Sequence, residues 1–587
     1  MFKLIKNFKK KDWLIVLVSI VLIVMQVWLE LKMPDYMSKV TVLVQTEGSK
    51  MSEILKNGGY MLLCAFGSLV GAVIVGYLIA LLASGFSRNL RSKLFRKVED
   101  MSMSEIKEFS TNSLITRTTN DITQVEMFIG FGLQLLIKAP VTAVWAITKI
   151  LNKSWEWSMV TAVAVVVLLI VIGILTIVVM PKFKIVQKLT DKLNEVTREN
   201  LTGIRVVRAF NAEEYQQNKF EDVNTDLTNM QLFNQKAFSV LSPTMYLVMY
   251  FLTLGIYFVG AYLIRDAGMV DKISIFGNMV VFSSYAMQVI MSFLMLAMIF
   301  MMVPRAQVSA NRINEVLDTE ITVKSGTIDK NTTNEVGTVE FRNVGFKYPD
   351  GEDAVLSNVS FKANKGDTVA FIGSTGSGKS TLINLIPRFY DATEGEILVD
   401  GVNVKDYNLN FLHDKIGYVS QKAVIFNDTV TGNVAYGDNG KGKISKEKVK
   451  EAIEVAQGKD FVEKMENTYD TQMAQSGTNV SGGQKQRLSI ARAIARDPEI
   501  YIFDDSFSAL DYKTDSILRK ELKKYTKDAT TLIVAQRIGT IMNADKILVL
   551  DEGKVVGEGA HKELLKNCEV YKQIALSQLS KEELDNA

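Results

Sequence analysis

Six apolar stretches, each long enough to cross a lipid bilayer as a helix, constrain this chain more than any other feature. They all lie in the first half of the 587 residues, near Leu14–Leu31, Gly59–Ser84, Leu133–Leu151, Ser158–Met180, Ser239–Ile264 and Ile273–Val303. A helix needs about 20 residues to span a hydrocarbon core of about 30 Å. The helix is also one of the few structures that satisfy all backbone polar groups in lipid. The first half therefore predicts a membrane domain with six helical spans.

Basic residues gather on one side of these spans. Five lysines precede the first stretch, seven basic residues lie in the 48-residue connection between the second and third stretches, and nine lie in the 58-residue connection between the fourth and fifth. Cytoplasmic loops carry the excess of Lys and Arg, so we expect both long connections and both termini to be cytoplasmic. Segments such as FKIVQKLTDKLNEV have helical periodicity, which predicts span helices that extend beyond the membrane. We expect a multi-pass protein of the plasma membrane.

The whole-chain charge and the cysteine content exclude other classes. With 67 basic and 64 acidic residues, the net charge of +3 gives no reason to expect a nucleic-acid partner. The two cysteines, Cys64 and Cys568, differ in their surroundings and are predicted to be free thiols. The basic start MFKLIKNFKKKDW is followed by an apolar run without a small-residue cleavage site, so we interpret it as a cytosolic flank.

The second half has a different pattern. From about Gly337, strand-like runs such as DTVAFIG, EIYIFDD and KILVLD alternate with helical stretches, which is typical of a layered α/β domain. We therefore predict three regions: a membrane domain over 1–303, a linker over 304–336 and a nucleotide-binding domain over 337–587.

A glycine-rich loop gives this second domain its chemistry. The run GSTGSGKS matches GxxxxGK[ST] between a predicted strand and a predicted helix, where backbone N–H groups surround a nucleotide's phosphates. Lys379 would contact the β- and γ-phosphates, and Ser380 would bind Mg²⁺ with Asp504, which ends the apolar strand EIYIFD. The predicted ATP-binding residues are Gly373, Ser374, Thr375, Gly376, Ser377, Gly378, Lys379, Ser380 and Thr381.

A third motif, SGGQ at Ser481, Gly482, Gly483 and Gln484, lies between the loop and Asp504 at the start of a predicted helix. With the other two motifs it resembles the ATP-binding cassette (ABC) family, whose signature is LSGGQ; here Val480 replaces the leucine. The resemblance covers nearly the whole chain. It implies the type I (type IV) ABC exporter fold, with an α-helical six-span transmembrane domain fused to an α/β nucleotide-binding domain.

The resemblance also assigns further roles. Two cassettes would close head-to-tail on two ATP molecules, so that the SGGQ residues and Asp511 contact the partner's nucleotide. Tyr348 would stack on adenine, and Gln421 would contact Mg²⁺ and the attacking water. Glu213 and Glu214 fall where the family has a coupling helix.

Two residues depart from the family pattern. Asp505 stands where the family has the glutamate that polarises water, and Gln536 replaces the switch histidine; His413 and His561 lie elsewhere in the sequence. An aspartate is shorter by about 1 Å, and such a displacement can cost about 100-fold in rate. Glutamine cannot carry a positive charge.

These departures predict a slow ATP site on this chain beside an intact signature. The combination predicts a heterodimer with a second, non-identical half-transporter that carries the true glutamate and histidine. It resembles the degenerate-site subunit of heterodimeric bacterial multidrug exporters. A homodimeric exporter is the main alternative; a gated channel is a further one, and the six spans exclude a soluble cassette ATPase.

The sixth stretch indicates a place for the cargo. Met287, Met291, Met295, Met298 and Met302 share one helical face, and methionine adapts to varied apolar shapes. Gln288 and Lys138 are polar groups within spans. This set predicts a cavity for amphipathic drug-like molecules, although a methionine face can also pack against helices or lipid, and Lys138 can reach an interface. Drug, membrane lipid and peptide all remain possible cargoes, so a lipid or peptide exporter or flippase is an alternative function.

Overall fold

The computed structural model describes residues 1–151, 155–437 and 439–579. The chain divides into two compact units, which are considered separately. The helical unit comprises Met1–Lys97 and Asn112–Asp318, and the α/β unit comprises Val98–Thr111 and Thr319–Ala587. The chain therefore passes between the units three times, at 97/98, 111/112 and 318/319.

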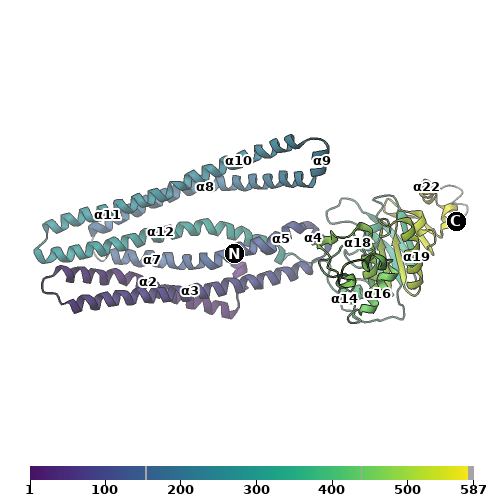
Figure 1. Cartoon of the computed structure of the whole chain (residues 1–587), viewed down its shortest axis with the longest axis horizontal. Helices are drawn as coiled ribbons and strands as arrows, with labels where there is room; N and C mark the ends of the chain where they lie inside the picture. Colours follow the sequence, from purple (N-terminus) through teal and green to yellow (C-terminus); the bar gives the residue numbers. More distant parts are fainter. Residues whose placement is uncertain (152–154, 438, 580–587) are drawn as a thin grey trace. The chain divides into compact units, whose positions relative to one another are not determined.

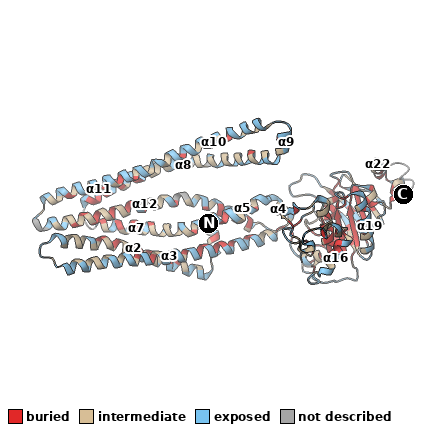
Figure 2. Cartoon of the chain, in the orientation of Figure 1, coloured by how far each residue is buried: buried red, intermediate tan, exposed pale blue. Residues whose placement is uncertain are grey.

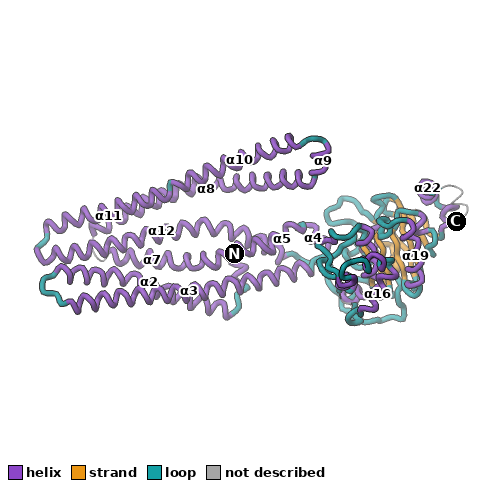
Figure 3. Tube along the Cα trace, viewed as in Figure 1, coloured by secondary structure: helices purple, strands orange, loops and turns teal. Residues whose placement is uncertain are grey.

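The helical unit contains the long helices, drawn as purple tubes in Figure 3. Six helices among the described residues are long and apolar enough to cross a membrane, as the sequence predicts. The elements of this unit are α1 (Phe2–Ile5), α2 (Lys10–Gln45), α3 (Met51–Glu99), α5 (Thr111–Thr116), η1 (Arg117–Asp121), α6 (Ile122–Met127), η2 (Phe128–Gly132), α7 (Leu133–Leu151), α8 (Trp155–Thr202), α9 (Ile204–Ala209), α10 (Glu213–Ser239), α11 (Leu241–Asp266) and α12 (Met269–Asp318). The helix α12 continues through Pro304 to Asp318, so the first part of the predicted linker is helical.

The helices α8 and α10 run side by side to a short tip helix, α9 (Figure 1). They join the remaining helices through α11, which packs on α12 and α8. Because most span residues are exposed or half-buried within this single chain (Figure 2), the apolar faces of the helices are available to lipid and to a second chain.

Two ion pairs lie inside the apolar helical unit. Lys138 on α7 contacts Glu30 on α2 at 2.9 Å, and Glu30 also accepts hydrogen bonds from Gln26 and Ser68. Lys149 binds Asp35 at 2.7 Å. Charges within an apolar helix bundle are costly unless they are paired, and these two pairs join α2 to α7.

The α/β unit is built on a six-stranded sheet in the order β10-β9-β3-β8-β7-β6, parallel except for β10. A second, antiparallel sheet has the order β2-β1-β4-β5. The strands are β1 (Val339–Phe346), β2 (Leu356–Ala363), β3 (Thr368–Gly373), β4 (Glu394–Val399), β5 (Val402–Asn403), β6 (Ile416–Val419), β7 (Ile500–Asp504), β8 (Thr530–Val534), β9 (Lys546–Asp551) and β10 (Lys554–Gly559). The strands β3, β7 and β8 are almost fully buried, which explains their continuous apolar sequence.

Helices cover the parallel sheet. They are α13 (Lys379–Asn384), α14 (Leu409–Asp414), α15 (Val430–Val434), α16 (Lys446–Val455), α17 (Lys459–Val462), α18 (Gly482–Ala495), α19 (Tyr512–Tyr525), α20 (Ile538–Ile541), α21 (His561–Asn567) and α22 (Glu569–Gln578). The predicted fold class, a six-span helical domain joined to an α/β domain, is confirmed. Cys64 and Cys568 are both free thiols.

The α/β unit also includes α4 (Met103–Phe109), which comes from the first long connection. Glu105 is buried and accepts hydrogen bonds from the hydroxyl and the backbone N–H of Thr322. Although burial alone would raise its pKa, hydrogen bonds from Ser102 and Thr322 keep the pKa of Glu105 below its ordinary value. On the other side of α4, Lys107 forms an ion pair of 2.7 Å with Asp350.

Candidate nucleotide site

The predicted phosphate loop connects the central strand β3 to α13. Gly376 and Gly378 have φ angles of 88° and 93°, a left-handed conformation that favours glycine. A Cβ atom on Gly378 would lie 2.7 Å from a methyl group of Leu356. Both glycines are therefore required by the course of the loop, as the sequence predicts.

The side chain of Lys379 lies within the loop. Its Nζ donates to the carbonyl oxygens of Gly373, at 2.9 Å, and Ser374, at 2.7 Å. Burial lowers the pKa of Lys379, and the nearby carboxylates of Asp505 and Asp504 act in the opposite direction. The Lys379 ammonium group is thus held by two carbonyl oxygens of the loop. The oxygen atoms of a bound phosphate could take the place of these carbonyl oxygens.

Ser380 and Asp504 come together from α13 and the end of β7. The Ser380 hydroxyl donates to Asp504 Oδ1 at 2.8 Å. Burial raises the pKa of Asp504, and the neighbouring charge of Asp505 raises it further. A hydroxyl beside a buried carboxylate is the oxygen ligand set that suits Mg²⁺, so these two residues fit the predicted ion.

Asp505 is bound by two amide groups. Gln536 Nε2 donates to Asp505 Oδ2 at 3.0 Å, and Gln421 Nε2 donates to the same oxygen at 3.4 Å. The backbone of Asp505 is left-handed, with φ of 47°, and burial raises the pKa of its carboxyl group. The structure thus brings together both departures from the family pattern and the predicted Gln421.

Tyr348 lies beside α13, where its hydroxyl is 3.0 Å from that of Thr381. Its ring makes edge contacts with Phe346 and Tyr390, and Lys107 Nζ lies 5.4 Å from the ring centre. The sequence interpretation missed Lys107 and Tyr390, because contacts between residues so distant in sequence leave no local pattern.

The predicted signature residues lie at the start of α18. Ser481 is its N-cap: the hydroxyl accepts from Gln484 N at 3.3 Å, and Gln484 Oε1 accepts from Ser481 N at 2.9 Å. Asp511 caps α19 in the same way, through Thr514 N at 3.0 Å. That hydrogen bond lowers the pKa of Asp511. Ser481, Gly482 and Asp511 are all exposed.

In the helical unit, a cavity of about 490 Å³ lies between α7, α8, α12 and the junction of α10 with α11. It is almost entirely apolar. The α12 side chains that line it are Leu296, Ala297, Ile299, Val303 and Pro304, so the predicted methionines are not among its lining residues. Met291 and Met298 are 43% and 44% exposed, and Met287, Met295 and Met302 are half-buried. That these methionines line a cargo cavity stays a prediction.

The other two predicted cargo residues have different surroundings. Lys138 pairs with Glu30 on α2, whereas its neighbours Leu136 and Pro140 line the cavity. The Gln288 Oε1 atom is buried and has no hydrogen-bond partner among the described residues.

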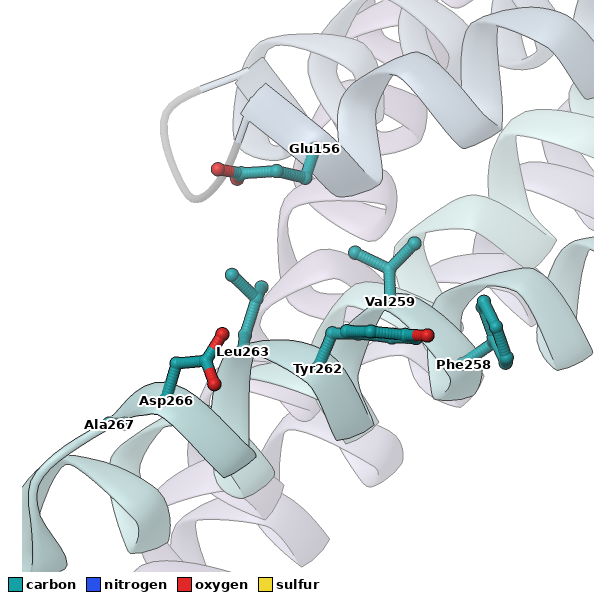
Figure 4. A pocket seen from close by; sticks show the side chains of 7 residues that line it. All are labelled: Glu156, Phe258, Val259, Tyr262, Leu263, Asp266 and Ala267. Atoms are coloured by element: carbon teal, nitrogen blue, oxygen red, sulfur yellow. The ribbon is translucent and has the colours of Figure 1, made fainter.

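A second hollow, of about 440 Å³, lies between Glu156 at the start of α8 and the last turns of α11 (Figure 4). Asp266, which faces it, already binds Arg265 at 2.8 Å. Arg265 also stacks on Tyr262 at 4.9 Å. Of the described residues that line the hollow, Asp266 and the ring of Tyr262 are therefore already engaged within the chain.

The tip helix α9 and the start of α10 carry the predicted coupling segment. Glu213 and Glu214 form the first turn of α10. Around them, Val206, Phe210 and Tyr215 are 61%, 78% and 67% exposed. This exposed apolar tip is unusual at the end of a helical hairpin and is typical of a contact surface.

Comparison with known proteins agrees with these features. Residues 14–293 match the model of the ABC transporter transmembrane region, and residues 356–508 match that of the ABC transporter family's ATP-binding domain. An uncharacterised ABC transporter ATP-binding protein of Mycobacterium tuberculosis is 37% identical over 521 residues, covering 89% of this chain and 87% of the relative.

An ATP-dependent lipid A-core flippase of Pseudomonas aeruginosa is 33% identical, over 84% of this chain and 80% of the flippase. A bacterial Atm1-family ABC exporter with ATP bound has the same fold, with a TM-score of 0.80 at 24% identity, covering 96% of this chain and 98% of the exporter. The chain is therefore a multi-pass membrane protein of the ABC transporter family, an exporter that carries its transmembrane and ATP-binding domains on one polypeptide.

Proposed function

We propose that this chain is one half of a heterodimeric exporter that moves amphipathic small molecules out across the plasma membrane. In this proposal its termini and α/β unit are cytoplasmic, and its own ATP site binds ATP with Mg²⁺ but hydrolyses it slowly. The observation that carries the proposal is the carboxylate of Asp505, one oxygen of which accepts hydrogen bonds from both Gln421 and Gln536.

A general base must reach the proton of the attacking water. Asp505 is shorter than glutamate, and Oδ2 is already engaged by two amides, so its carboxylate is poorly placed to orient a water molecule. Gln536 can hydrogen-bond a γ-phosphate but cannot supply the charge of a histidine. By contrast, Lys379, Ser380 and Asp504 retain the residue types that bind phosphate and Mg²⁺, and Mg²⁺ would neutralise phosphate charge there.

The signature residues argue for a partner of a different sequence. Ser481, Gly482 and Asp511 are exposed and unaltered, so they can contact a nucleotide held by another chain. An intact signature has value only if the phosphate loop opposite it supports hydrolysis. This chain's own loop supports it poorly, and a partner with a glutamate and a histidine at these positions would supply the competent site.

Two exposed apolar surfaces support assembly with a second half-transporter. One is the tip of α9 with Val206 and Phe210. The other is in the α/β unit, where Phe426 and Tyr436 stack at 4.3 Å and are 39% and 48% exposed. Arg492 lies over both rings, at 5.4 and 5.5 Å. Protein interfaces are enriched in aromatic residues and arginine. We therefore propose that this aromatic surface binds the tip helix of the partner.

The cavity between α7, α8, α12 and the junction of α10 with α11 supports an apolar cargo with few polar groups. Its volume of about 490 Å³ lies within the range of small-molecule sites. Gln288, whose buried Oε1 has no partner among the described residues, does not line this cavity. Lipid flipping is the second candidate function, because a relative that is 33% identical is named as a lipid A-core flippase.

The test is to purify this chain alone and together with the half-transporter encoded next to it. We expect the lone chain to bind ATP and hydrolyse it slowly, and the pair to hydrolyse it at least about 100-fold faster. Rapid hydrolysis by the lone chain, abolished by Asp505→Asn, would refute the heterodimer. Adding amphipathic dyes or fluorescent lipids to the reconstituted pair then separates drug export from lipid flipping.

A further inference from the structure

The start of the chain carries a cluster of positive charge. Lys3, Lys6, Lys9, Lys10 and Lys11 are all exposed; residues 3–11 are here called the basic segment. Its neighbour Asp12 uses its carboxylate to accept from Lys9 N, at 2.8 Å. The first span begins within a few residues, and Trp13, 52% exposed, belongs to the residue types that mark a membrane interface.

The basic segment is held against the helical unit. Leu4 is completely buried, and Phe8 makes an edge contact with Phe86 at 5.0 Å. Lys93 Nζ donates to Asn7 Oδ1 at 2.9 Å, and Lys3 pairs with Asp318 at 2.5 Å. A basic flank that only fixed the orientation of the first span would need none of these contacts.

These contacts involve residues close to two of the three points where the chain passes between the units. Phe86 and Lys93 belong to α3, which leads to the crossing at 97/98, and Asp318 is the last residue before the crossing at 318/319. The segment therefore joins the start of the first span to α3 and α12, the two helices after which the chain continues in the α/β unit.

We propose that the basic segment binds anionic phospholipid headgroups at the cytoplasmic membrane surface and conveys their presence to α3 and α12. The cytoplasmic location of the basic segment rests on the proposed function, whereas the lipid contact itself does not depend on transport. Lysines next to a span attract anionic lipids, each strengthening binding by about 5-fold, and this attraction falls off over about 10 Å. Zwitterionic lipids carry no net charge, so they would attract the four lysines that do not pair with Asp318 more weakly.

The first test measures lipid binding to the full-length chain by native mass spectrometry. Phosphatidylglycerol and phosphatidylcholine are compared on the wild type and on the variant Lys6/Lys9/Lys10/Lys11→Gln. We expect the wild type to prefer phosphatidylglycerol by at least about 10-fold and the variant to lose that preference. The single change Lys10→Gln, which leaves most of the flank intact, should lose about 5-fold.

The matched control is Lys513/Lys520/Lys523/Lys527→Gln, which removes the same charge from exposed positions of the α/β unit. It should retain the preference. Equal losses in both quadruple variants, or an unchanged preference in the basic-segment variant, would overturn the lipid site. ATP binding by each variant verifies that the chain has folded. This control uses the single chain, so its outcome does not depend on whether the native partner is a second copy or a different half-transporter.

The second test addresses transmission. In nanodiscs, we expect phosphatidylglycerol to change the ATP affinity of the wild type by about 5-fold or more, the lower end of the usual coupling between two linked sites. Asp318→Asn should still bind the lipid but lose this dependence. If Asp318→Asn retains the dependence, the route through α12 is wrong.

Discussion

This chain has two surfaces that we propose contact nucleotide, and they differ in burial and in how closely their residues match the family pattern. The phosphate-loop surface (Gly373–Ser380 with Gln421, Asp504, Asp505 and Gln536) has buried residues at its centre, among them Lys379, Asp504 and Asp505, and two of its residues are altered. The signature surface (Ser481–Gln484 with Asp511) is exposed or half-buried at every residue and unaltered, and its polar groups cap helices of their own chain. We interpret the difference as a division of labour, in which the chain holds one nucleotide and assists hydrolysis of another.

The largest expected effect tests this division directly. In the assembled complex, Ser481→Arg should reduce ATP hydrolysis by about 100-fold or more, because removing a group that stabilises the transition state has effects of this size. Asp505→Asn should change the same rate by less than about 3-fold, since its site contributes little. Steady-state phosphate release measures both. Equal losses would mean that the two surfaces serve equivalent sites.

The next effect is a gain. Asp505→Glu combined with Gln536→His restores the family's residues on the phosphate-loop surface and should raise the hydrolysis rate of the lone chain by about 10-fold or more, as expected for a repositioned general base. Single-turnover kinetics distinguishes faster hydrolysis from faster product release. Gln536→Asn, a control that retains an amide, should give no gain; a gain there would show that the bond to Asp505 alone limits the rate.

A smaller effect concerns adenine binding on the phosphate-loop side. Tyr348→Ala should weaken ATP binding by about 10-fold, the usual loss of one base–aromatic stack. Tyr348→Phe retains the ring and loses only the contact with Thr381, so its affinity should remain within about 2-fold. Equilibrium binding of a fluorescent ATP analogue measures the two. A similar loss of ATP affinity in both variants would mean that the Tyr348 hydroxyl, and not its ring, contacts the adenine.

The smallest expected effect is a change in unfolding temperature, which should have opposite signs for substitutions on the two surfaces. Burial raises the pKa of Asp504, so the folded chain binds a proton there more readily than the unfolded chain, and ionisation destabilises the fold. Asp504→Asn should therefore raise the unfolding temperature by about 1–3 °C at pH 8. The advantage should shrink as the pH falls, because the wild type then regains its proton.

On the signature surface, a hydrogen bond from Thr514 lowers the pKa of Asp511. Its ionised form therefore stabilises the fold, in full above the ordinary pKa of an aspartate, about 3.9. Asp511→Ala removes this cap and should lower the unfolding temperature at pH 8 by less than about 3 °C. Calorimetry without nucleotide measures both variants, and shifts of the same sign would contradict the contrast.

Local patterns made much of this molecule predictable. Lys379 and Ser380 follow a buried strand, and Asp504 ends another, so the edge of a parallel sheet brings them together. The six spans follow from hydropathy alone, since lipid leaves few alternatives to a helix.

Other features depend on contacts that no local pattern encodes. The predicted first span ended at Leu31, but α2 continues through Pro34 to Gln45, which places Glu30 and Asp35 within a helix facing α7. Lys138 was predicted from its position to be a cargo residue, and its pairing with Glu30 became visible only in three dimensions. The face of α12 that lines the cavity likewise depends on how α8 and α11 pack, whereas the methionine periodicity indicates only that a face exists.

One consequence for experimental design comes from α4. A soluble fragment that starts at residue 319 would discard Glu105, which binds Thr322, and Lys107, which lies over the ring of Tyr348. Such a truncated cassette would leave Thr322 without its buried partner Glu105 and would lack the ion pair between Lys107 and Asp350. If Tyr348 stacks on adenine as we propose, nucleotide affinities measured on this fragment would describe a site that lacks Lys107.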